Sequence, residues 1–361
     1  MKNMKKIIVG TGAAIVLLTG CSSAGNIDFS QYITKQMEVT SMEANGVTSI
    51  HLNYDEKKVK DQDSRKLLNL FSDIQITTHV VTENKDTVSM EGTLTLKKGK
   101  IPFKLFVKGN EVIIQLDNAS KPIRIIDKNI LPAASKESYA ETCKKVIPYL
   151  VKHMPTPSTL QVMSKQDKVH NEMVDGHNIH LEVYGNEVPS LVLGLMEGIS
   201  KDKEAIAVFV RAINEADSST KVTAESFKKE LDTMIGNFKK DLDAAKKDKE
   251  FEMLFSKDNY VKSDIFVDNT LHERKSNMKI HVGLPNAEES GVKSVDIETE
   301  SESWNVNQPV KAQGISASQY LTEEQVTAND GKAFLDTLNK KDSVLYDLLV
   351  HDLKITGEKK K

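Results

Sequence analysis

Strict alternation of apolar and polar side chains is the feature that most constrains the fold of this 361-residue chain. From Val88 to Leu96 every second residue is apolar or glycine, and the residues between them are polar. The same period continues over residues 101–107 and 112–116, with turn residues at 98–100 and 109–110. Because successive side chains of a strand point to opposite faces, this pattern predicts antiparallel hairpins with one apolar and one polar face.

Other stretches of the chain have helical periodicity, with apolar residues three or four positions apart. The spacing predicts helices over Phe29 to Ala44, Ser135 to Met154, Val188 to Ile199, Ile206 to Ile213, Phe227 to Ala245 and Gly331 to Leu353. It predicts further strands over residues 47–54, 72–127, 160–173, 177–184, 260–269, 274–282 and 292–304, with a turn at Asp175-Gly176. These elements favour an α+β fold: a large curved antiparallel sheet, or half-barrel, with helices packed on its apolar face.

Composition limits the class of protein and its partners. The chain is 39% hydrophobic and 28% charged, which is typical of a folded domain. Its net charge is -3, and acids and lysines are interspersed, so no nucleic-acid partner is expected. No linker rich in Pro, Gly or Ser interrupts residues 29–361, which predicts a single domain there.

The first 21 residues have the form of an export signal. Three lysines, at positions 2, 5 and 6, precede an apolar or small run over residues 7–18 that is too short to span a bilayer. Leu18-Thr19-Gly20-Cys21 follows and resembles the lipobox of bacterial lipoproteins. We therefore expect residues 1–20 to be a signal peptide and residues 21–28 a tether. The alternative is an ordinary signal peptide or membrane anchor that ends in a chance cysteine.

Cys21 is the expected lipidation site, and its diacylglyceryl thioether would hold the protein stably on the outer face of the cell membrane. In an envelope with two membranes, this would be the periplasmic side. Cys143 is the only other cysteine, so no disulfide is expected within the lipidated chain. Helical spacing places Cys143 on an apolar stripe, which predicts a buried, unreactive thiol.

Several short sequence segments are similar to segments of poorly characterised Gram-positive lipoproteins with a LolA/LppX-like fold. These segments are residues 175–183, residues 304–309 and residues 343–349. The resemblance implies a curved antiparallel half-barrel with helices in its mouth. It offers no functional motif, so it assigns no catalytic or ligand-binding residue.

Two sets of polar residues are candidates for metal ligands. His51, His180 and His281 each lie between apolar neighbours on the polar side of a predicted strand. The acids at positions 296, 298, 300 and 302 have period two and would project from one face, where calcium binding is conceivable. In both cases a solvated strand face explains the pattern without a metal, so we expect no metal and no cofactor.

The apolar helix stripes suggest a place for a ligand. A cavity between the sheet and the helices could accept an acyl chain. It would be lined by Leu195, Met196, Phe209, Leu231, Met234 and Phe238. Core packing explains the same stripes without a ligand. The leading hypothesis is a non-enzymatic lipoprotein that binds an apolar or amphiphilic ligand. The alternatives are an envelope scaffold with a filled core, which acts on an unidentified protein partner, and an extracytoplasmic hydrolase. The chain has no motif that indicates a hydrolase.

Overall fold

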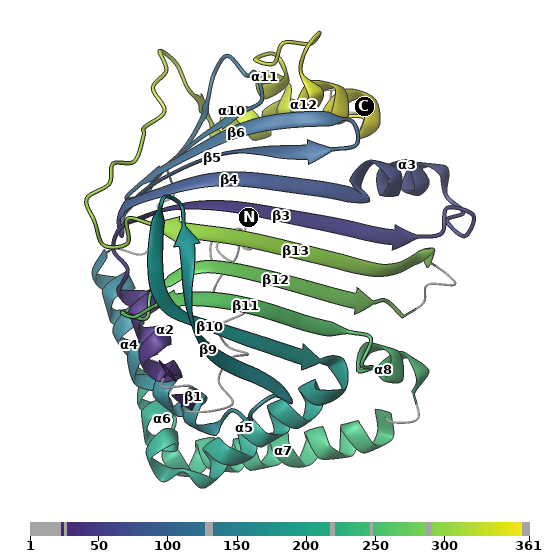
Figure 1. Ribbon diagram of the computed structural model, residues 1–361. Coiled ribbons are helices and arrows are strands. Elements are labelled where there is room, and N and C mark those ends of the chain that lie inside the picture. Colours follow the sequence, from purple (N-terminus) through teal and green to yellow (C-terminus); the bar gives the residue numbers. More distant parts are fainter. Residues whose placement is uncertain are drawn as a thin grey trace. The chain divides into compact units, whose positions relative to one another are not determined.

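A computed structural model describes residues 23–24, 27–126, 133–216, 221–245, 248–285 and 290–355. Twelve strands form one sheet in the order β14-β8-β7-β6-β5-β4-β3-β13-β12-β11-β10-β9. The described strand pairings are antiparallel except the one between β14 and β8, and the described strands do not close into a barrel. The predicted α+β class, with a large, mostly antiparallel sheet and helices on its apolar face, is therefore confirmed (Figure 1).

The chain divides into two compact units. Unit 1 comprises Met1–Glu38 and Ala134–Pro285, and unit 2 comprises Val39–Ala133 and Asn286–Lys361. Each unit contains its own strands, its own helices and its own apolar clusters.

Unit 1 combines several long helices with strands that are buried to different extents. Its strands are β1 (Ser23–Ala24), β2 (Ile27–Asp28), β9 (Thr159–Val169), β10 (Glu172–Tyr184), β11 (Tyr260–Asp268) and β12 (Glu273–Gly283). Its helices are α2 (Phe29–Glu38), α4 (Ala133–His153), the 3-10 turn η2 (Gly185–Glu187), α5 (Val188–Lys201), α6 (Lys203–Ala216), α7 (Ala224–Ala245) and α8 (Lys249–Leu254).

The core of unit 1 lies between β10, β11 and the helices α2, α4 and α5. Ile179 and Val267 are 0% exposed, and Leu181 is 1% exposed. Phe29 of α2 and Val151 of α4 pack against these strands. The period-two pattern thus places one face of β10 and β11 under helices of ten or more residues.

Unit 2 contains most of the sheet, and its described helices have ten residues or fewer. Its strands are β3 (Met42–Tyr54), β4 (Asp73–Asn84), β5 (Thr87–Leu96), β6 (Gly99–Lys108), β7 (Glu111–Leu116), β8 (Ile123–Ile126), β13 (Val292–Trp304) and β14 (Leu321–Thr322). Its helices are α3 (Gln62–Phe71), α10 (Glu323–Thr327), the 3-10 turn η3 (Ala328–Gly331), α11 (Lys332–Leu335), α12 (Val344–Asp347) and the π-helix η4 (Leu348–Asp352).

Three sequence predictions were wrong at the level of elements. The first helix ends at Glu38 because the chain enters β3 at Met42. Asp175 and Gly176 do not form a turn but pair with β9 inside β10, and the hairpin turns after Val169, where His170 has a positive φ of 51°. The helix expected over residues 331–353 is divided into α11, α12 and η4.

The division of the last helix has a local cause. The Ser343 side chain accepts a hydrogen bond from the Tyr346 amide and caps a new helix, so α12 cannot continue α11. The sequence interpretation also missed α3. Its N-cap, Asp61, accepts a hydrogen bond from the Ser64 amide at 2.7 Å.

Candidate functional site in unit 2

One face of the unit 2 sheet is apolar and only half-buried. The strand registers place Ile50 opposite Ile297, Ile76 opposite Leu94, and Met90 opposite both Val80 and Leu105. Directly opposed residues lie on the same face of a sheet. We call the following half-buried residues of this surface the open apolar face: Ile50, Leu52, Ile76, Val80, Val88, Met90, Leu105, Val107, Val295 and Ile297.

Short C-terminal helices cover the end of this face. Leu96 and Ile101 are 5% and 4% exposed, and they pack with Leu348 of η4. The approach of α12 is close at Gly99, where a Cβ atom would lie 2.9 Å from Val344 Cγ2. Gly99 also has a φ of +152°, so both its backbone conformation and this contact favour glycine.

A pocket lies beside α3, with a volume of about 630 Å3. It is lined by Val59, Lys60, Asp61, Ser64, Leu67, Leu68, Phe71 and Ser290. Phe71 also belongs to the apolar cluster that contains Ile74, Leu94 and Leu348, so this cluster links the pocket to the covered end of the sheet. The volume lies within the range of small-molecule sites.

Charged side chains border the same apolar cluster. The ammonium group of Lys98 pairs with both Asp347 and Asp352, and Lys66 Nζ lies 3.0 Å from Asp352 Oδ1. The Lys98 and Asp352 side chains are only 21% and 10% exposed. We call these four residues the latch, because they join α3 and the β5–β6 turn to the C-terminal helices.

All groups of the latch for which a pKa shift is resolved are held in their charged forms. Burial lowers the pKa of Lys98, but hydrogen bonds to Asp347 and Asp352 outweigh this effect and raise it. Burial likewise opposes ionisation of Asp352, yet the two lysines keep its pKa below the ordinary value. The hydrogen bond from Lys98 is the main cause of the lowered pKa of Asp347.

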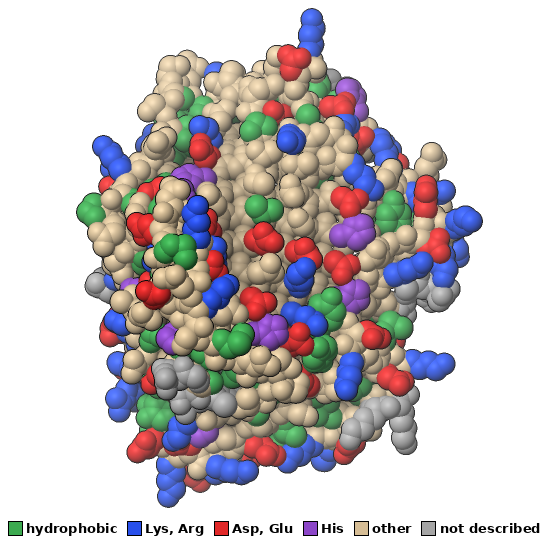
Figure 2. Space-filling view, in the orientation of Figure 1, with side chains coloured by type: hydrophobic (Ala, Val, Ile, Leu, Met, Phe, Trp, Pro, Cys, Tyr) green, Lys and Arg blue, Asp and Glu red, His purple; other side chains and the backbone are tan. Residues whose placement is uncertain are grey.

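The opposite face of the strands is polar. Figure 2 shows acidic, basic and histidine side chains gathered over the strands on the side in view. In unit 2 the exposed His51 Nδ1 lies 2.5 Å from Asp73 Oδ1, and Lys97 Nζ lies 3.0 Å from Asp73 Oδ2. A second groove of about 630 Å3 crosses β3 to β7 and includes His79 and Lys104 among its lining residues.

The candidate metal ligands do not form a recognisable metal centre among the described residues. His51 pairs with Asp73, and His180 Nδ1 lies 2.9 Å from Asp264 Oδ1. The register places Asp296 opposite His51 and Glu298 opposite Ser49, which puts the acidic row on the polar face. Within the parts of the chain described, no group of three or more His, Cys, Asp or Glu side chains has a geometry suited to a metal ion.

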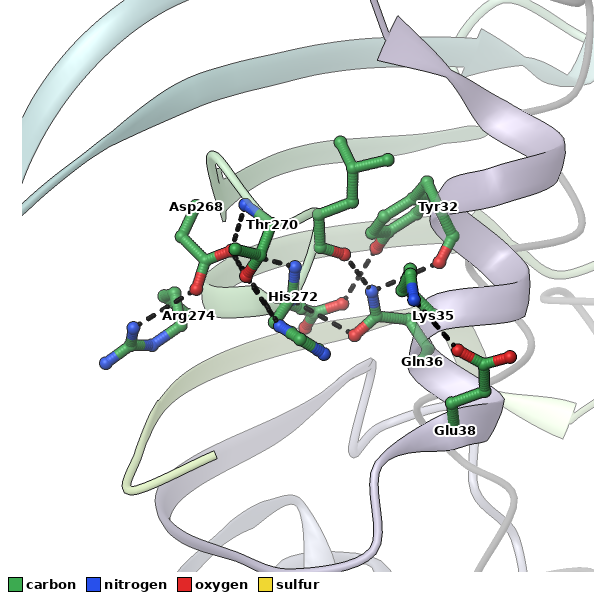
Figure 3. A network of polar contacts seen from close by, with 10 residues as sticks. Tyr32, Lys35, Gln36, Glu38, Asp268, Thr270, His272 and Arg274 are labelled. Carbon is green, nitrogen blue, oxygen red and sulfur yellow. Dashed lines mark hydrogen bonds and ion pairs between the residues drawn. The ribbon is translucent and has the colours of Figure 1, made fainter. Parts of the chain in front are cut away.

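Unit 1 contains a polar network that serves packing (Figure 3). The fully buried Tyr32 of α2 donates a hydrogen bond to Glu273 Oε2 at 3.0 Å. Gln36 donates to the Leu271 carbonyl and accepts from the Glu273 amide, which fixes α2 on the β11–β12 turn. Burial raises the pKa of Glu273, although hydrogen bonds from Tyr32 and Ser276 oppose the shift. Burial also raises the pKa of Tyr32.

The six residues expected to line a ligand cavity lie on three neighbouring helices of unit 1. Leu195 and Met196 are on α5, Phe209 is on α6, and Leu231, Met234 and Phe238 are on α7. Met234 is 58% exposed, whereas the other five are half-buried. The rings of Phe209 and Phe227 stack with centroids 6.1 Å apart. The pocket beside α3 and the latch contain none of these six residues.

The sequence interpretation missed α3 and the latch. The pattern Asp61-x-x-Ser64, followed by apolar residues at positions 67, 68 and 71, is a helix-start signal that was available for α3. No local signal connects Lys98 with Asp352, because 254 positions separate them.

Neither a comparison with models of known protein families nor a comparison with curated proteins gives a match for this chain. Cys21 and residues 1–20 lie outside the described residues. Within the described residues, no helix has the length and hydrophobicity required to cross a membrane. Cys143 is a free cysteine and is half-buried, so it is less enclosed than its sequence pattern predicts.

Proposed function

We propose that this protein is a membrane-anchored, extracytoplasmic lipoprotein without enzymatic activity that binds an apolar or amphiphilic ligand. The observation that carries the proposal is the open apolar face of unit 2. Apolar side chains that keep contact with water can gain free energy by burial against a ligand, at about 25 cal/mol per Å2 of apolar surface. The pocket beside α3 provides a concave region connected to the same apolar cluster.

We prefer a ligand site on the sheet of unit 2 to one among the helices of unit 1. In unit 1 the strand residues at the centre of the core, Ile179, Leu181 and Val267, are 0–1% exposed, so this part of the sheet offers little apolar surface to a ligand. In unit 2 the open apolar face provides such a surface. The six helix residues of unit 1 remain a second prediction for ligand contact.

Binding is tested with the soluble chain that begins at Ser22. Native mass spectrometry followed by lipid extraction detects a ligand that copurifies with it. Titration with the fluorescent apolar probe N-phenyl-1-naphthylamine then measures affinity. Met90→Lys, which puts a charge on the open apolar face, should weaken probe binding by about tenfold, equivalent to ~1.4 kcal/mol.

Glu91→Lys is the matched control because Glu91 is the next residue of β5 and points to the polar face. It should leave probe affinity unchanged. The emission of Trp304, the single tryptophan, checks that both variants are folded. An unaltered affinity in folded Met90→Lys, together with a ligand-free mass, would reject this site and favour the scaffold alternative.

The anchor needs a separate test. Metabolic labelling with a fatty acid should modify the unaltered protein, and Cys21→Ala should abolish labelling and release the protein from the membrane. Failure to label the unaltered protein in its own type of host would refute lipidation at Cys21.

A further inference from the structure

We propose that the ligand of the open apolar face is an anionic amphiphile, and that Asp347 and Asp352 occupy its headgroup site at Lys66 and Lys98. This inference rests on the proposed function and names the chemical class of its ligand. The anion is a carboxylate or a phosphate on a long apolar chain.

The two cations belong to elements that also form the apolar cluster. Lys98 lies in the turn between Leu96 and Ile101, and both of these residues are buried in the cluster. Lys66 is on α3, four positions before Leu70, which packs against the same cluster. Positive charge and apolar surface therefore meet at one end of the sheet.

The strands that lead away from this end can accommodate an extended chain. From Leu96 back to Met90, six residue steps along β5 span about 20 Å at the rise of a β-strand. Leu94 and Met90 point to the same face along this length, opposite Ile101 and Leu105 of β6. A headgroup at Lys98 would thus place a long acyl chain along the open apolar face.

The two acids come from a short segment near the C-terminus. Asp347 ends α12, and Asp352 ends the five-residue π-helix η4. Leu348 holds this segment in the apolar cluster, and the ion pairs of the latch hold the acids. Single-turn π-helices are rare and frequently lie at functional sites. A carboxylate on such a short segment can be exchanged for the anion of a ligand.

The electrostatics of this end favour an anion beyond the latch. Arg65, next to Lys66 on α3, has a buried Nε atom with no hydrogen-bond partner among the described residues. Asp61, which lines the pocket, has its pKa lowered first by hydrogen bonds from Ser64 and further by the charges of Arg65 and Lys354. If the anion of a ligand replaces Asp352, the ammonium groups of Lys66 and Lys98 remain to pair with its headgroup.

The experiment compares ligands that share one acyl chain but differ in headgroup. Oleate, monooleoyl phosphatidic acid and uncharged monooleoylglycerol each displace N-phenyl-1-naphthylamine from the chain that begins at Ser22. Oleate, the phosphate or both should bind at least about tenfold more tightly than monooleoylglycerol. The stronger of the two anions distinguishes a carboxylate ligand from a phosphate headgroup.

Variants of the latch test the exchange. Lys98→Gln should abolish the preference for anions, and Lys98→Arg should restore it. Asp352→Asn removes the competing carboxylate, so it should strengthen oleate binding several-fold without strengthening binding of monooleoylglycerol. Asp63→Asn is the control, because Asp63 pairs with Lys354 at 3.2 Å on the exposed surface of the same two segments. It should change neither affinity.

The outcomes separate the two proposals. Equal binding of anionic and uncharged ligands would overturn the headgroup site while leaving the proposed function intact. Displacement of the probe by none of the three would contradict the proposed function itself. If Asp352→Asn unfolds, the comparison of Lys98→Gln with Lys98→Arg still decides, because loss of preference in both would overturn the role of the positive charge.

Discussion

Unit 1 and unit 2 both place helices on an apolar sheet face, but they cover that face to different extents. In unit 1, helices α2, α4 and α5 have 10, 21 and 14 residues, and Ile179, Leu181 and Val267 beneath them are 0–1% exposed. In unit 2, α11 and α12 have four residues each and η4 has five. Such short helices shield the end of the sheet and leave the open apolar face half-buried. The extent to which helices cover the sheet, more than the strand pattern, separates a filled core from a surface available to a ligand.

Core truncation gives the largest expected contrast between the units. Phe29→Ala should lower the free energy of unfolding by about 3–5 kcal/mol, because Phe29 is fully buried and its loss leaves a cavity. Leu105→Ala, on the open apolar face, should cost about 1 kcal/mol because part of that side chain already contacts water.

Urea unfolding followed by far-UV circular dichroism measures both changes. Trp304 belongs to unit 2, so its fluorescence identifies the transition of that unit. Equal losses for the two variants would show that the surface of unit 2 is packed as tightly as the core of unit 1.

The contrast between the units was only partly predictable from sequence. Alternation identified the strands around Met90 and Leu105, since local period reports which side chains share a face. It could not show whether a helix covers that face, because coverage depends on residues far along the chain. The C-terminal pattern predicted one long helix, but the Ser343 cap divides it and limits how much of the sheet it covers.

The candidate site also combines features that the local sequence pattern predicts with features that depend on residues far apart in the sequence. The residues of β5 and β6 on the open apolar face were predicted to share one apolar side of the sheet, and the structure confirms that they do. The latch was not predicted, because Lys98 and Asp352 meet only through the fold. Asp175-Gly176 shows the converse error: a turn-forming pair was overridden by its pairing with β9.

Glu273, in the polar network of unit 1, gives a pH-dependent test of how that unit is packed. Glu273→Gln should stabilise the protein at neutral pH, because burial raises the pKa of Glu273 and makes its ionised form unfavourable in the folded state. Below about pH 4 the carboxyl is protonated in both folded and unfolded chains, so the advantage should vanish. It should grow as pH rises through the raised pKa of the folded state, then remain constant.

Thermal unfolding of the unaltered protein and of Glu273→Gln, measured about every pH unit between about pH 3 and pH 8, tests this expectation. Tyr32→Phe is the companion variant, because it removes the hydroxyl that donates to Glu273 and leaves the ring in place. It should destabilise the folded state. An advantage of Glu273→Gln that is independent of pH would contradict the assignment to the buried charge.

The smallest expected effect is at an exposed ion pair of unit 2. Asp63→Asn breaks the ion pair between Asp63 and Lys354. The side chain of Asp63 is 71% exposed, and that of Lys354 is 67% exposed. It should lower the free energy of unfolding by about 0.5 kcal/mol or less, and added salt should abolish the difference. Asp352→Asn should cost more, because it leaves Lys98 partly buried with one counterion fewer. Equal losses in denaturant titrations would show that the latch is no stronger than a surface pair.

The short hairpin formed by β1 and β2 limits how far an anchored form of the protein could move. Ser23 pairs with Asp28. The two residues that flank Asp28, Ile27 and Phe29, are fully buried in unit 1. Only two residue steps separate Cys21 from Ser23, a contour of about 7 Å when fully extended. With a lipid on Cys21, unit 1 would turn about its attachment point but could not diffuse away from the bilayer. Any exchange of ligand with a distant acceptor would then require the acceptor to approach the membrane.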